Sequence, residues 1–173
     1  MAQRWPVTLH ANYGRGVASQ DARGVVQRPQ GPRVSTTDFS QAGVSVNLQR
    51  FSMAADAFLI DRSHEQVYVP DDGSFELRGP SRAYGMECKA SGRVTRRIRV
   101  NGGITRVFDA FYRGTAPRVF VDGAPHVVAH GGLTATGWKG WNGSVQVRHH
   151  SGYRLDGVDG NIRAAREASV AHV

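Results

Sequence analysis

The sequence predicts an all-β fold, either an antiparallel β-sandwich or a jelly-roll-like barrel, with an extended N-terminal arm and a short C-terminal helix. Two observations carry this prediction. Short apolar runs alternate with polar residues at the period of a half-buried strand. Corners rich in Gly, Asp and Asn separate these runs, with no helical stretch between them. We therefore expect about eight to ten short strands and no α/β architecture.

Residues 1–42 are predicted to form the arm. The stretch QDARGVVQRPQGPRVSTTDFSQAG shows no sustained periodicity of apolar residues, and Pro29 and Pro32 block a helix. Isolated apolar residues such as Trp5 and Phe39 are too sparse for a core, although each could dock onto a neighbour. Unstructured segments of this length are usually disordered or ordered by a partner.

Residues 43–173 are predicted to form a single β-sandwich domain. Strands are expected at 44–48, 57–61, 66–70, 74–79, 83–89 and 144–150, and residues 117–130 are expected to form two more about a tight corner at Asp122-Gly123. The stretch RVTRRIRVNGGITRVFDAF, residues 93–111, is predicted to be a hairpin folded about Asn101-Gly102-Gly103. A short helix is expected over residues 161–172, where Asn161 can cap it and Arg163 can pair with Glu167.

Composition favours a folded chain with a basic surface. The 173 residues carry a net charge of +8, with twenty arginines against only Lys89 and Lys139. Arginine suits protein interfaces as well as phosphates. The single Cys88 cannot form an internal disulfide and is predicted to be a small buried hydrophobe. No apolar run is long enough for a membrane span and no signal-peptide segment is recognisable, so a secretory route is not expected.

The arginines of the predicted hairpin are the first candidate interface. Arg96 and Arg106 fall among apolar residues, and each predicted strand has two mixed faces, whereas antiparallel sheets usually sort more cleanly. A solvated or internally paired face, a protein interface and a phosphate-binding surface all remain open. The candidate interface residues of the whole chain are Trp5, Arg96, Arg97, Arg99, Arg106, Phe108, Tyr112, Trp138 and Trp141.

Trp138 and Trp141 lie in the glycine-rich stretch GGLTATGWKGWNGS. They could fold back to close the end of a sandwich. Alternatively, they could be exposed, as tryptophans are in protein interfaces and in platforms for sugars.

No catalytic or cofactor-binding motif is recognisable in the sequence. There is no nucleophile elbow, P-loop, dinucleotide fingerprint or HExxH, so no enzyme, catalytic residue or cofactor is expected. His126 and His130 lie four residues apart on a predicted strand, roughly 13 Å from each other, and cannot share one metal ion. No metal site is expected.

The arm, the strands, the interface-type loops and the terminal helix together resemble the build of many virus capsid and phage tail or head components. This resemblance implies a non-enzymatic virion structural protein, assembled in the host cytoplasm, whose partners are copies of itself and other virion proteins. One alternative is a basic β-barrel that binds single-stranded nucleic acid through the hairpin. The other is a glycan-binding module that uses Trp138 and Trp141.

Overall fold

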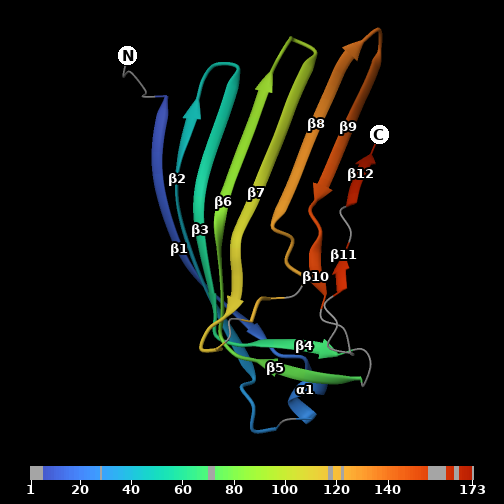
Figure 1. Cartoon of the computed structure of the whole chain (residues 1–173). Helices are drawn as coiled ribbons and strands as arrows, with labels where there is room; N and C mark the ends of the chain where they lie inside the picture. The colour runs from blue at the N-terminus through green and yellow to red at the C-terminus, as the bar shows by residue number, and fades with distance from the viewer. Residues whose placement is uncertain are drawn as a thin grey trace.

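The computed structural model describes residues 6–27, 29–69, 73–116, 119–121, 123–155, 163–165 and 168–172. Eight strands form one antiparallel sheet in the order β1-β2-β3-β6-β7-β8-β9-β12 (Figure 1). Their bounds are Val7–Ser19 (β1), Val34–Asn47 (β2), Phe51–Arg62 (β3), Ser81–Arg93 (β6), Ile98–Tyr112 (β7), Val127–Trp138 (β8), Trp141–His150 (β9) and Ala168–His172 (β12). Each long strand therefore pairs with the one before it in this meander.

The two ends of the sheet differ in the length of their connections. At one end, which we call the turn end, residues 48–50, 94–97 and 139–140 link β2 to β3, β6 to β7 and β8 to β9. At the other, the connection end, lie the helix α1 (Ala22–Gln27) and the hairpin of β4 (Glu65–Val69) and β5 (Ser74–Arg78) (Figure 1). A two-stranded pair of β10 (Tyr153–Leu155) and β11 (Arg163–Ala165) precedes β12.

The tight turns have local causes. Lys139 and Gly140 both have positive φ, 50° and 87°, which suits a two-residue hairpin turn. In the β6–β7 turn, the Thr95 hydroxyl oxygen accepts the backbone N–H groups of Arg97 and Ile98, at 3.2 and 3.0 Å. The side chain thus replaces backbone partners that the turn lacks.

The connection end holds a small packed cluster around Phe75. Phe75 is buried beneath α1, where Gly24 leaves no room for a side chain. The Phe75 N–H donates to Gln27, and the guanidinium of Arg23 lies 5.2 Å from the ring centroid. A six-residue helix is too short to hold itself, so these contacts hold α1 in place.

The prediction of an all-β, mainly antiparallel fold is confirmed, but two packed sheets are not seen in the described part of the chain. Its buried apolar side chains are only Phe75, Ala110 and Tyr112. A sandwich would bury one whole face of each sheet. The alternation that predicted a half-buried strand therefore comes from a single sheet with two chemically different faces.

The extended arm is also corrected. Thirteen consecutive residues of the predicted arm, Val7–Ser19, form β1 and pair in register with β2. The predicted boundary between residues 42 and 43 falls inside β2. Both faces of β1 are exposed, so its side chains show no pattern of core residues. β1 is held in place by its backbone pairing with β2.

The expected helix over residues 161–172 is not seen among the described residues, which form β11 and β12. Residues 168–172 instead pair with the edge of β9, because a helix with a thin apolar face would bury little. None of the helices in the described ranges is long and apolar enough to cross a membrane.

The predicted Asn101-Gly102-Gly103 corner is wrong as well. These residues lie inside β7, opposite Gly132, Gly131 and His130 of β8. The chain turns at Val94–Arg97 instead. Gly103 is needed in the strand because a side chain there would collide with the His130 ring.

Candidate functional site

The register of the sheet sorts its residues into two faces, because residues paired across neighbouring strands point to the same side. One row joins Leu9, Val44, Ala55, Cys88, Ile104 and Ala129. The adjacent row joins His10, Gly43, Asp56, Glu87 and Thr105. We call the side of the first row the apolar face and the side of the second row the polar face.

The apolar face is open to solvent. Leu9 is 81% exposed and Ile104, near the middle of the sheet, is 48% exposed. Other large exposed side chains on this side of the sheet are Val7, Tyr13, Val17, Val34, Phe51, Met53, Tyr84, Met86, Leu133, Trp141, Val145 and Val147. Cys88 is exposed there too, so the expectation that it is buried is wrong. An exposed apolar surface that crosses most of a sheet marks an interaction surface.

A row of paired charges ends the apolar face toward the connection end. This row runs across β1, β2, β3 and β6 as Arg15, Asp38, Asp61 and Arg82. Arg15 Nε donates to Asp38 Oδ1 at 2.7 Å and Arg82 Nη2 donates to Asp61 Oδ2 at 2.8 Å. The hydrogen bonds from Arg15, and from the Tyr13 hydroxyl, lower the pKa of Asp38 to about 2. Arg82 lowers the pKa of Asp61 in the same way.

The apolar face has a defined height. In β3 it extends from Phe51 at the turn end to Leu59, which pairs with Tyr84 next to the charged row. These nine residues span roughly 26 Å at about 3.3 Å per residue. Tyr84 and Phe108 lie together at the charged limit, with ring centroids 6.3 Å apart. Aromatic side chains therefore lie at both limits of the apolar face.

Two residues interrupt the apolar face. Arg106 pairs with Met86, in the row next to that of Tyr84 and on its side toward the turn end. The guanidinium of Arg106 lies 5.9 Å from the Phe108 ring centroid. A long side chain can bury its stem and direct its charge to the edge in this way. His149 pairs with Ala129 near the edge of the sheet.

The turn end carries positive charge alone. Its exposed cations are Arg50, Arg93, Arg96, Arg97, Arg99 and Lys139. None of the six makes an ion pair within the described part of the chain. Segments 47–52, 92–99 and 134–144 contain no Asp or Glu.

The polar face is a hydrogen-bonding surface. His10 Nε2 lies 2.5 Å from Oδ1 of Asp56, which is only 5% exposed. Gly43 lies between them in the sheet, and a side chain there would collide with Asp56. Lys89 pairs with Glu87 at 2.9 Å. Across the described residues, no group of three or more His, Cys, Asp or Glu side chains could hold a metal ion.

The structure separates the predicted hairpin arginines. Arg96 and Arg97 lie in the turn between β6 and β7, and Arg99 pairs with Arg93 on the polar side of the sheet. These three belong to the basic turn end. Arg106 lies on the apolar face near the middle of β7, two residues after Ile104.

A β-bulge explains the mixed faces of the second predicted strand. The register shifts where Tyr84 pairs with Asp109 and Gly85 pairs with Val107, which leaves Phe108 as the extra residue. Residues beyond the bulge therefore change sides. Phe108 is exposed beside Tyr84, whereas Tyr112 is 5% exposed and donates its hydroxyl to Glu65 of β4 at 3.2 Å.

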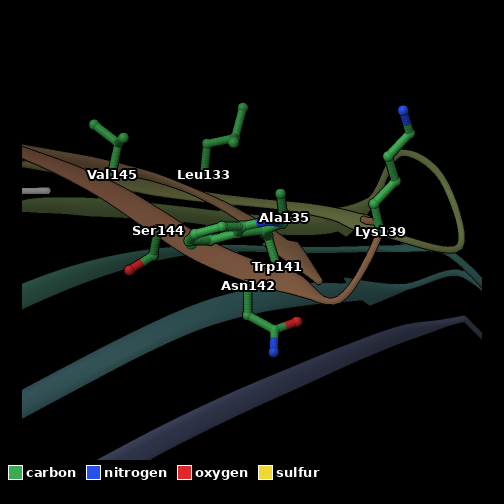
Figure 2. Close-up of a pocket in the computed structure, with 8 residues that line it drawn as sticks. Leu133, Ala135, Lys139, Trp141, Asn142, Ser144 and Val145 are labelled. Carbon is green, nitrogen blue, oxygen red and sulfur yellow. The ribbon is translucent and has the colours of Figure 1, made fainter. Parts of the chain in front are cut away.

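Trp141 is 78% exposed, so it does not close the end of a sandwich. It lies over an open depression of about 660 Å³ whose other side chains come from β8, β9 and their turn. Figure 2 shows Leu133, Val145 and Lys139 on one side of the strands and Ser144 on the other. Trp5 and the side chain of Trp138 lie outside the described residues.

Sequence reasoning missed the apolar face itself. The alternation of Val44, Val46 and Leu48 was recognised, but it was assigned to a sandwich core. Leu9 was assigned to the arm. The register needed to join these residues into one surface depends on long-range pairing, which short patterns do not specify.

No family model and no curated protein matches the sequence. Among solved structures, the chain is similar to the ferric-catecholate import receptor Fiu from E. coli K12, with TM-score 0.68 and 17% identity over 96% of this chain and 26% of the receptor. It is similar to the copper transporter OprC, with TM-score 0.67 and 15% identity over 98% of this chain and 28% of the transporter. BauA, the ferric preacinetobactin receptor from Acinetobacter baumannii, matches with TM-score 0.66 and 18% identity over 96% of this chain and 26% of the receptor.

The chain thus spans about a quarter of the length of these proteins, and the likeness is one of fold. The similar structures are receptors and transporters rather than enzymes. They contradict the predicted virion structural protein, its capsid or phage role, its virion partners and its virion location. The virion resemblance depended on an arm and a sandwich, neither of which is seen among the described residues.

Proposed function

We propose that this chain forms a membrane-spanning section of the wall of a bacterial outer-membrane transport receptor. The apolar face contacts lipid, and the polar face lines the interior. The observation that carries the proposal is the exposed apolar face, bounded by charged side chains at both ends. Strands that cross an outer membrane alternate apolar and polar residues, with an apolar band about 25 Å tall and aromatic residues at both limits.

The fold of the similar structures supports this proposal. Those proteins are, by their names, a ferric-catecholate import receptor, a ferric preacinetobactin receptor and a copper transporter. We propose a metal ion or metal chelate as the cargo class on that ground. A helical span needs an uninterrupted run of about 18 apolar residues, whereas a strand crosses in about 9–11 alternating residues and leaves a much weaker signal in the sequence.

The edges of the sheet require completion. Within the described residues β1 pairs only with β2, and β12 only with β9, so one side of each has unpaired backbone groups. Lipid offers no hydrogen-bond partner for such groups. Further strands, from a longer chain or from other copies, therefore complete the wall.

The connection lengths support an orientation. Outer-membrane proteins have short turns on the periplasmic side and longer loops outside. The turn end is therefore assigned to the periplasm and the connection end, with α1 and the β4–β5 hairpin, to the exterior.

Ile104→Arg tests the lipid contact, with Thr105→Arg as the matched control on the polar face. In phospholipid vesicles, Ile104→Arg should lower the free energy of unfolding by about 2–4 kcal/mol, because the charge lies near the bilayer midplane. Thr105→Arg can pair with Glu87 and should cost less than about 1 kcal/mol. Urea titrations followed by tryptophan fluorescence measure both values, and equal costs for the two variants would contradict the proposal.

A further inference from the structure

The arginines of this protein are partnered differently at the two ends of the sheet. At the connection end, three arginines are paired within the chain: Arg62 Nη1 lies 2.6 Å from Glu65, Arg82 pairs with Asp61, and Arg78 Nη2 lies 3.2 Å from Glu76. At the turn end, six exposed cations have no acidic residue in their segments. This clustering of unpaired charge indicates an external anion.

The basic turns lie directly beside the end of the apolar face. Arg50 precedes Phe51, and Arg99 precedes Val100, which pairs with Leu133. Lys139 projects on the same side as Leu133 beside Trp141 (Figure 2). An exposed tryptophan next to cations is typical of the layer where hydrocarbon meets headgroups.

The β6–β7 turn presents its arginines from a fixed backbone. Besides the two bonds to the Thr95 hydroxyl, the Val94 N–H donates to the Ile98 carbonyl at 3.0 Å. Arg96 and Arg97 therefore project from a hydrogen-bonded turn. A guanidinium can bind two phosphate oxygens at once.

We propose that the turn end is a binding surface for the phosphate groups of anionic phospholipids in the leaflet that it meets. The proposal rests on the proposed membrane-spanning function and adds the lipid class. A single-stranded nucleic acid fits less well, because bases need aromatic side chains to stack on beside the cations. The aromatic side chains nearest the turns, Phe51 and Trp141, belong to the apolar face, which the proposed function places against hydrocarbon, where bases cannot reach them.

The test uses Trp141 as a reporter of the lipids at the turn end, in the full chain with Trp5→Phe and Trp138→Phe. The protein is folded into vesicles that mix phosphatidylcholine with phosphatidylglycerol, one of which carries bromine on its acyl chains. Quenching then gives the relative binding constant of the two lipids at this position. We expect selectivity of about fivefold or more for phosphatidylglycerol, because one Arg or Lys near an anionic lipid surface raises the binding constant by about that factor.

The variant Arg50→Gln, Arg96→Gln, Arg97→Gln should reduce this selectivity to about one, and 1 M salt should reduce it in the unmodified turns. The control Arg33→Gln, Arg113→Gln, Arg148→Gln removes the same charge from exposed positions away from the turns and should keep the selectivity within about twofold.

The outcomes separate the two proposals. Quenching by both lipids without selectivity overturns the phospholipid surface and keeps the membrane-spanning function. Quenching by neither lipid overturns both. If the arginines instead bind a thymidine oligonucleotide and show no lipid selectivity, the turn end is a nucleic-acid surface and the phospholipid proposal is wrong.

Discussion

Asp38 marks the limit of the apolar face because two neighbours hold its carboxylate on the same side as Leu9 and Val44. The Tyr13 hydroxyl donates to Asp38 Oδ1 at 2.6 Å, and Arg15 donates to both oxygens, at 2.7 and 3.0 Å. An ion pair at this level requires water or headgroups around it. In the proposed wall, Asp38 therefore lies just outside the membrane, and its charge is available to join β1 to β2.

The ion pair makes the β1–β2 pairing sensitive to acid. The pKa of Asp38 is lowered from 3.8 to about 2 by the Arg15 hydrogen bonds, so the stabilisation is present above about pH 4 and is lost as the pH falls through about 2. Amide hydrogen exchange in β1 should accelerate relative to β7 over this interval. Asp38→Asn should remove that acid-dependent step, and an unchanged step would contradict the role of Asp38.

Single residues also explain where sequence reasoning failed. Phe108 is one extra residue in β7, and it moves Tyr112 to the other face from Arg106. A bulge leaves no reliable signal in a single strand, since it exists only relative to the paired strand. The mixed faces left a solvated or internally paired face, a protein interface and a phosphate-binding surface open, and the bulge accounts for the change of side beyond Val107.

At the scale of elements, strands with a clear alternation of apolar and polar residues were predicted better than strands without one. The predicted strand at 144–150 lies within β9, where Val145 and Val147 alternate with polar residues. β1 alternates too weakly to be recognised, because Gly14, Gly16 and Ala18 occupy its polar side. Its pairing with β2 depends on backbone hydrogen bonds, which composition does not reveal.

α1 and the β4–β5 hairpin form a unit whose stability depends on Phe75. Phe75→Ala should remove the contacts with Gly24 and Arg23 and weaken the docking of α1 by about 2 kcal/mol, since a partly buried aromatic ring is lost. Tryptic cleavage at Arg23 should become roughly 30-fold faster, while the exchange of sheet amides stays unchanged.

Val26→Ala is the matched control for that prediction. Val26 lies in the same helix but is 77% exposed, so its truncation should leave cleavage at Arg23 within about twofold. Equal cleavage of the two variants would show that Phe75 does not hold α1.

The whole molecule has the opposite arrangement from a water-soluble sheet. Its large apolar side chains lie on an open face, and the apolar side chains buried in the described residues are few. The fold class could be predicted because strand patterns are local. The arrangement of the faces could not, because it depends on the register of eight strands and on the solvent that surrounds them.

The natural Cys88 gives the most direct measurement of the central claim, that the apolar face contacts lipid. A nitroxide attached to this single thiol, in the chain folded into vesicles, should collide readily with oxygen and rarely with a water-soluble nickel complex. The same label at Ser45→Cys in a Cys88→Ala background lies one residue from the same register row but on the polar face, and should show the reverse preference. Nickel access to the Cys88 label equal to that at position 45 would contradict the account.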